Sequence, residues 1–401
     1  MRRLIAGVKK PQLLSSLDLT RWAEGLYQLS VSEPPLRGAI FTIEQLEVHA
    51  RALAGSHQIG HRQGGDQLIK RLNNSERVIA RCHEVMSRAH AMGRRLTPAA
   101  EWLLDNHYLV EEQIYLARKH LPRGYGRQLP PVANGEATGL PRVHDLIVEL
   151  VVHVDGRVDE EALARYVAAY QSVTQLTLGE LWSVPIMLRL ALIENLRRVA
   201  MSITWQRAHR DRAWVWAQRI DAPSEGHEAA LLVLADMVRA NPPLSTAFVA
   251  QFTQTLQGRG STTNLALPWL EQRLAEQGQT IEEAVRADGQ AQAADQASMA
   301  NSIASLRLVN TTEWHAFVEL NSATEKILKT EPAGVYDQMD FATRDDYRHA
   351  VESVARRGHF AEESVARMAV ALTTEHYLAD STGVAAHVGY VLVDDGKRDL
   401  W

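Results

Sequence analysis

The sequence is poor in cysteine. Cys82 is the only one among 401 residues, so the chain can form neither an internal disulfide nor a zinc site built from several thiolates. Cys82 lies in a helical pattern beside His83, and neighbours in sequence do not face each other on a helix. We therefore predict an unreactive helix residue rather than a nucleophile, in a protein suited to a reducing compartment.

The sequence also lacks an apolar run long enough to cross a membrane. The most apolar stretch, residues 184–194, contains Arg189 and Glu194 and is closed by Arg197 and Arg198. A membrane-spanning helix needs about 20 predominantly apolar residues. The first residues carry two arginines but no apolar run of signal-peptide length follows them. We expect no membrane span within this chain and no secretion signal.

The sequence also has no large excess of positive or of negative charge. The chain has 43 basic and 48 acidic side chains, a formal net charge of −5, and these charges are well mixed along the sequence. No field of one sign attracts the chain to nucleic acid or to an anionic membrane, and no nucleic-acid recognition motif stands out. We predict no nucleic-acid partner. The 46% of hydrophobic residues suffices for a globular core.

Helix start signals recur along the chain, whereas alternating strand patterns are missing. Capping boxes begin at Thr42, Thr177 and Thr280, and Thr97-Pro98 pairs an N-cap with proline at the first helical position. The patterns predict helices at 42–53, 74–93, 97–120, from 141, after the turn at 155–156, and at 177–220, 225–240, 245–257, 281–308, 312–329, 344–357 and 361–378. The predicted fold class is all-α, a multi-helix array of packed antiparallel helix pairs.

A segment rich in proline and glycine divides these helices. Residues 122–141 contain eight such residues in twenty positions, which excludes regular structure. A second break lies near 258–261. We predict an N-terminal helical subdomain at 1–121, a connector at 122–141, a central helical subdomain at 142–257 and a C-terminal helical subdomain at 258–401.

Residue types used in catalysis and in metal binding are present, but their spacing does not predict a site. His57 and His61 have a metal-ligand spacing, but the surrounding glycines argue against a helix, and we interpret both as solvent-facing. Asp105, Glu111 and Glu112 crowd one helix, yet the two glutamates diverge. No dinucleotide fingerprint, P-loop or nucleophile elbow is found. We predict no catalytic, cofactor-binding or metal-binding residue.

Several motifs taken together resemble one family. They are TPAAEWLLDN at 97–106, VEEQI at 110–114, LPRGY at 121–125, GLPRV at 139–143, LTLGELWSVPIMLRLALIENLRR at 176–198, MDFATRDDYRH at 339–349 and HVGY at 387–390. This pattern resembles the N-terminal cytoplasmic region of bacterial cyclic β-1,2-glucan synthases, from about Phe41 to Tyr390.

The resemblance implies a place for the chain within a larger system. In that family the N-terminal region precedes membrane helices around a glycosyltransferase domain that uses UDP-glucose, and a phosphorylase-like domain limits glucan length. Trp401 falls about where the first membrane helix would begin, so we expect the reactive groups to lie beyond this chain. The implied location is cytoplasmic, at the inner face of the bacterial inner membrane. The implied partner is the transferase domain, and contact with glucan stays open.

The motif positions selected as interaction candidates are Arg123, Tyr125, Arg142, Glu180, Arg189, Glu194, Arg344 and Tyr347. We favour an internal network, in which arginine forks pair with carboxylates, over contact with a ligand. The functional hypothesis is a non-catalytic helical scaffold or regulatory region of a cyclic β-1,2-glucan synthase. The alternative is a free-standing carbohydrate-binding or glycoside-active helical module, with aromatic side chains and two carboxylates converging on one surface.

Overall fold

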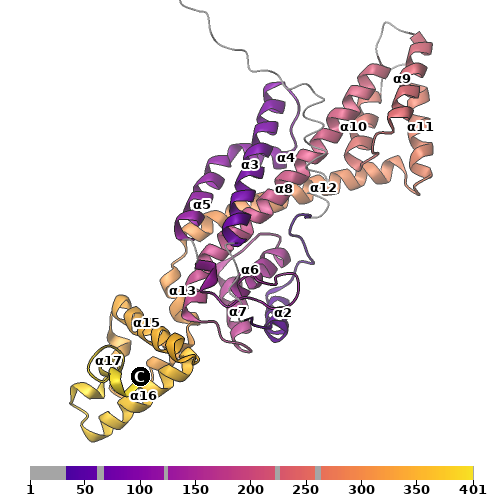
Figure 1. The fold of residues 1–401 in the computed structure, drawn as a ribbon. Helices are drawn as coiled ribbons and strands as arrows, with labels where there is room; N and C mark the ends of the chain where they lie inside the picture. The colour runs from indigo at the N-terminus through magenta and orange to yellow at the C-terminus, as the bar shows by residue number, and fades with distance from the viewer. Residues whose placement is uncertain (1–32, 61–66, 122–124, 222–225, 258–262, 401) are drawn as a thin grey trace, which may run out of the picture. The chain divides into compact units, whose positions relative to one another are not determined.

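The computed structural model describes residues 33–60, 67–121, 125–221, 226–257 and 263–400 (Figure 1). Across these ranges the chain is helical and forms no strand; two isolated antiparallel bridges join Ile59 to Val132 and Pro131 to Pro141. The predicted all-α array of packed helices is confirmed. In the same ranges, no helix combines the length and the apolarity needed to cross a bilayer.

Packing divides the chain into two compact units, each collected from three segments. The described residues of unit 1 fall within 1–36, 74–111 and 194–300, and those of unit 2 fall within 37–73, 112–193 and 301–401. Four helices have residues in both units: α3 Gln67–Ala91, α5 His107–His120, α8 Leu178–Ile220 and α12 Ile281–Thr311. The division into four consecutive parts that the sequence suggested remains a prediction.

All three predicted capping boxes are formed. In each, the N-cap hydroxyl accepts a backbone N–H three residues on, and the side chain at that third position accepts the backbone N–H of the cap. Both hydrogen bonds are present for Thr42 before α2 (Ile43–Ser56), for Thr177 before α8 and for Thr280 before α12. These starts are therefore set by local sequence.

Unit 1 has a core of aliphatic and phenylalanine side chains. The helices that lie entirely within unit 1 are α4 Pro98–Asp105, α9 Gly226–Ala240, α10 Thr246–Leu256 and α11 Thr263–Ala275. Phe248 and Phe252 of α10 are fully buried with stacked rings, and Met237 of α9 and Leu270 of α11 belong to the same cluster. The cluster also includes Ala213 and Ala217 of α8, whose small side chains allow other helices to approach closely.

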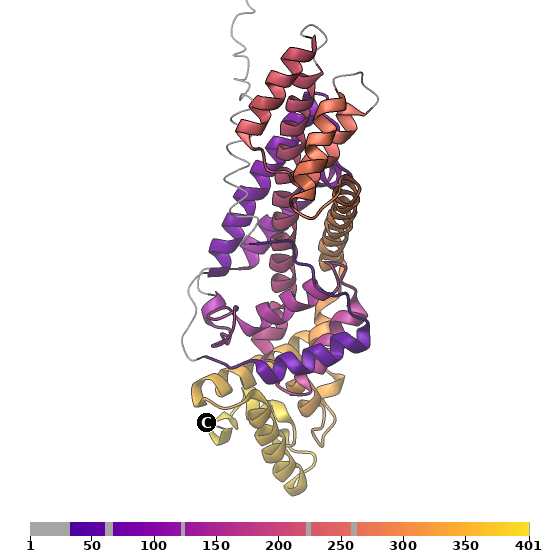
Figure 2. The ribbon, with the colours of Figure 1, turned by 90° about the vertical axis from the view of Figure 1, so that its right-hand side faces the viewer.

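Unit 2 contains two helical groups. One is formed by α2, α6 Arg142–His153 and α7 Glu160–Gln171, in which α2 packs against both other helices. The other lies at the yellow end of the chain in Figures 1 and 2. It comprises α13 Trp314–Asn321, α14 Ala323–Leu328, α15 Phe341–Gly358, α16 Glu362–Ala379, α17 Val388–Val393 and α18 Lys397–Leu400. Unit 2 also contains the short helices η1 Tyr125–Arg127, η2 Tyr336–Gln338 and η3 Val384–Ala386.

Two predicted helix ranges are corrected by the structure. The range 97–120 is two helices, because Asn106 ends α4 and its side-chain Nδ2 donates to the carbonyl of Trp102 at 3.0 Å. The range 312–329 divides at Ser322, whose hydroxyl accepts the N–H of Glu325 and so caps α14. Helix α11 was missed, because Pro268 lies inside it and polar residues precede it.

Candidate functional site at the start of helix α8

Two of the predicted interaction residues meet at the first turn of α8. The Arg142 guanidinium, at the start of α6, donates from Nε to Glu180 Oε1 at 2.6 Å and from Nη2 to Glu180 Oε2 at 2.7 Å. Nη2 also donates to the carbonyl of Gln175 at 2.7 Å. The side chains of Arg142 and Glu180 are only 6% and 0% exposed. Burial alone would lower the pKa of Arg142, but the hydrogen bond and the charge of Glu180 outweigh it and raise that pKa.

A carboxyl group that the sequence did not indicate lies beside this pair. Glu362, the first residue of α16, accepts the backbone N–H of Leu178 at 2.9 Å. Burial raises the pKa of Glu362 to about 7, and the negative charges of Glu352 and Glu180 add to this effect against the opposing hydrogen bond from Leu178. Glu362 thus titrates near neutral pH at the start of the longest helix.

Tyr125 belongs to the same neighbourhood. Its pKa is raised by burial and by the charge of Glu352. The carboxylate of Glu352 also reaches the first turn of α8, where a Cβ placed on Gly179 would lie 3.6 Å from Oε1. The α8-start site therefore consists of Tyr125, Arg142, Glu180, Glu352 and Glu362.

The hydrogen bonds of this site define what it can do chemically. A carboxyl group with a near-neutral pKa is suited to proton transfer. However, both oxygens of Glu180 are engaged by Arg142, and Oε2 also accepts from the N–H and hydroxyl of Thr177. The Glu362 carboxyl group accepts a hydrogen bond from the backbone N–H of Leu178. The groups are arranged to fix the start of α8 against α6 and α16.

The next two candidates lie further along α8 and have internal partners. Arg189 donates from Nε to Gln113 Oε1 at 3.1 Å and from Nη2 to Asn310 Oδ1 at 2.9 Å. Glu194 Oε1 accepts from Arg197 at 2.7 Å and from Arg198 at 2.9 Å. Despite the opposing effect of burial, these two arginines lower the pKa of Glu194 to about 2. Glu194 is therefore ionised throughout the physiological range.

Arg344 and Tyr347 lie on α15 in a second polar cluster. Arg344 Nη2 lies 2.5 Å from Glu319 Oε1, and the Tyr347 hydroxyl lies 3.4 Å from His387 Nε2. On the same helix Arg348, which the sequence did not single out, is fully buried and reaches Glu325 Oε2 at 2.5 Å. Sequence reasoning missed Arg348 because nothing local distinguishes it from the other arginines of α15. The remaining candidate, Arg123, lies outside the described residues.

The interpretation of His57 as a solvent-facing residue is wrong. Its side chain is 4% exposed. Its Nε2 lies 3.0 Å from Asp145 Oδ2 and its Nδ1 lies 2.8 Å from the hydroxyl of Tyr170. His57 therefore links the end of α2 to α6 and α7. His61 lies outside the described residues.

One group of side chains in the described ranges has the composition and proximity of metal ligands. It consists of His49, Glu149 and His153, whose potential ligand atoms all lie within 4.8 Å of one another. The sequence predicted no metal-binding residue, because His49 is 100 positions away from Glu149 and the pattern shows no local cluster.

The fold and the site define a class of protein: a helical array whose buried charged residues stabilise its own helices. No family model matches the chain. It is 33% identical over 308 residues to the cyclic beta-(1,2)-glucan synthase NdvB of Rhizobium meliloti (strain 1021). The alignment covers 76% of this chain and 11% of that protein, so the chain spans only a small part of its relative's length. The chain is thus related to a region of an NdvB-type protein, and the resemblance found in its motifs is confirmed.

Proposed function

We propose that this chain is a non-catalytic helical scaffold region of a cyclic β-1,2-glucan synthase. In this proposal, it contacts the cytosolic face of a membrane-embedded transferase domain and helps to hold that domain in a competent arrangement. Polymerisation from UDP-glucose would be carried out by other domains, as the resemblance implies. The observation that carries the proposal is the 33% identity to NdvB over most of the chain.

The use of the polar residues supports a scaffold more than a reaction centre. Among the motif positions that the structure describes, Arg142, Glu180, Arg189, Glu194 and Arg344 have their charged groups engaged with other side chains of this protein. Side chains that are engaged in this way fix helix registers. Because these side chains are engaged inside the protein, we propose that the outer faces of the helices contact the transferase domain.

A chimeric synthase tests the proposal. The region of NdvB that aligns with this chain is deleted in one variant and replaced in frame by residues 1–401 in another. Glucan formation from radiolabelled UDP-glucose is measured in membranes containing equal amounts of each protein. We expect the deletion to abolish synthesis and the replacement to restore it. Full activity of the deletion variant, or an inactive replacement that is stably inserted, would contradict a scaffold role.

A further inference from the structure

The group formed by His49, Glu149 and His153 joins two helices of unit 2. Glu149 and His153 are four residues apart on α6, so their side chains project from the same face, one turn apart. His49 faces them from α2, with its Nε2 3.0 Å from Glu149 Oε2. The Nε2 of His153 lies 3.6 Å from the same oxygen.

The two separations from Glu149 Oε2 are close to those between ligands of a tetrahedral zinc ion. Bonds of about 2.0–2.1 Å to nitrogen and oxygen in a tetrahedron place ligand atoms roughly 3.3 Å apart. The two observed distances, 3.0 and 3.6 Å, lie on either side of that value. The third separation, between the potential ligand atoms of His49 and His153, is within 4.8 Å.

The orientation of the His153 ring is fixed by groups behind it. Its Nδ1 lies 2.8 Å from the carbonyl of Ala39, which can only accept a hydrogen bond, so Nδ1 carries a proton. In the neutral ring, Nε2 then presents its lone pair toward Glu149. A backbone carbonyl on the far nitrogen is the usual second interaction of a metal-binding histidine.

The backbone around Ala39 holds this arrangement. The Phe41 ring stacks on His153 with centroids 3.9 Å apart and planes 7° apart, and the Phe41 N–H donates to the carbonyl of His153 at 3.0 Å. Gly38 donates to the carbonyl of Val152 at 3.1 Å, and an added Cβ there would lie 3.0 Å from His153 Cε1. The segment 38–41 thus clamps the imidazole in one orientation.

A second histidine–carboxylate pair between the same helices shows a different arrangement. His57 has its two nitrogens engaged by Asp145 and by Tyr170, so its hydrogen bonds are satisfied without a metal. At Glu149, in contrast, two imidazoles converge on one oxygen. Without a metal, a neutral His153 donates its one N–H to the carbonyl of Ala39 and has no proton to donate to Glu149.

We propose that His49, Glu149 and His153 form a binding site for Zn²⁺ that links α2 to α6. Two neutral imidazoles and one carboxylate supply three ligands, a set that zinc accepts with water in the fourth position. The side chains are 26%, 32% and 14% exposed, which leaves access for the ion and for that water. The site is independent of the proposed scaffold function.

Calorimetric titration of the metal-free full chain with ZnCl₂ at neutral pH tests the site. We expect one zinc ion per chain, and at least about a tenfold loss of affinity in H49Q, E149Q and H153Q. The matched control is H349Q, because His349 is an exposed histidine of α15 that also lies near a carboxylate, that of Asp345. Absence of zinc binding by the wild type, or equal binding by H49Q and H349Q, would overturn the proposal.

A measurement on the wild type avoids dependence on how the variants fold. X-ray absorption at the zinc edge of the loaded chain should show a first shell of nitrogen and oxygen with outer-shell scattering from two imidazoles. A shell without imidazole would contradict the site. Both experiments use the metal alone, so neither result depends on whether the chain supports glucan synthesis.

Discussion

Arg142 and Glu180 join α6 to the start of α8 through two parallel hydrogen bonds, 2.6 and 2.7 Å long, in an almost fully buried ion pair. A Glu180→Gln substitution keeps the size of the side chain but leaves the charge of Arg142 without its partner. Breaking a buried pair in this way costs about 3–5 kcal/mol. We expect the free energy of unfolding, measured by urea denaturation, to fall by that amount.

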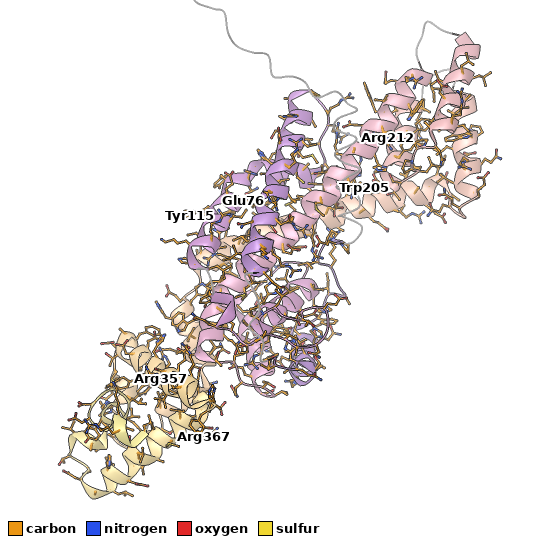
Figure 3. The ribbon with its side chains drawn as sticks, viewed as in Figure 1. Glu76, Tyr115, Trp205, Arg212, Arg357 and Arg367 are labelled. Carbon is orange, nitrogen blue, oxygen red and sulfur yellow. The ribbon has the colours of Figure 1, made fainter. Side chains whose placement is uncertain are left out.

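An exposed ion pair provides the matched control for this prediction. Arg367, labelled in Figure 3, donates to Glu363 at 2.8 Å on α16, and its side chain is 65% exposed. Glu363→Gln should change the free energy of unfolding by less than about 1 kcal/mol, because solvent screens such pairs. Equal effects of the two substitutions would show that the Arg142–Glu180 pair does not hold α8 in place.

Glu362 makes stability depend on pH. Its pKa is raised to about 7 in the folded protein from a usual value of 4.5. Between these values the folded state holds a proton that the unfolded state has released. This contribution to stability is complete below the unfolded pKa and is lost as the pH rises through about 7.

Glu362→Gln removes this dependence, because the amide stays neutral and can still accept the N–H of Leu178. We expect the stability of the wild type relative to the variant to fall by about 1–3 kcal/mol between about pH 5 and pH 8. Urea denaturation of both proteins at the two pH values measures the difference. A difference that is constant with pH would show that Glu362 has an ordinary pKa.

Arg348 should contribute more to the free energy of unfolding than Tyr347, the interaction candidate next to it. Its fully buried guanidinium pairs with Glu325 and with Asp345, at 2.5 and 2.9 Å. Arg348→Met should lower the free energy of unfolding by about 3 kcal/mol, because both carboxylates lose this partner. Tyr347→Phe removes only a 3.4 Å contact with His387 and should cost less than about 1 kcal/mol. Thermal unfolding of the two variants distinguishes these effects, and the reverse order would contradict them.

The thiol of Cys82 should be inert in the folded chain. It is fully buried, and burial raises its pKa to about 12 despite opposing effects from Thr204 and Arg197. At about pH 8 the thiolate fraction is lower than that of an ordinary cysteine by a factor of at least about 100. Reaction with a thiol reagent such as dithionitrobenzoate should be correspondingly slow and become rapid after denaturation. Rapid labelling of the folded chain would contradict this environment.

Local signals account for most of what the sequence predicted correctly. The capping boxes at Thr42, Thr177 and Thr280 are formed because each uses residues three positions apart. The break at Asn106 was missed because the apolar spacing continues through it, while the buried asparagine bonds to the preceding turn. Helix α11 was missed because Pro268 is usually a sign of a helix end.

The polar sites depend on contacts between distant residues, which a single sequence does not reveal. Glu362 gains its raised pKa from burial beside α8, 184 positions from its hydrogen-bond partner Leu178. His49 approaches Glu149 across 100 positions. Glu149 and His153 lie four positions apart, but His49 joins them only because α2 packs against α6.

In the scaffold proposal, the reactive groups of glucan synthesis lie outside this chain. Calorimetric titration of the purified chain with UDP-glucose and with β-1,2-linked glucooligosaccharides, followed by chromatography of the mixtures, tests it most directly. We expect no saturable heat of binding and no new product with either compound. Saturable binding, or turnover of either compound by the chain alone, would contradict it and favour a carbohydrate-binding or glycoside-active module.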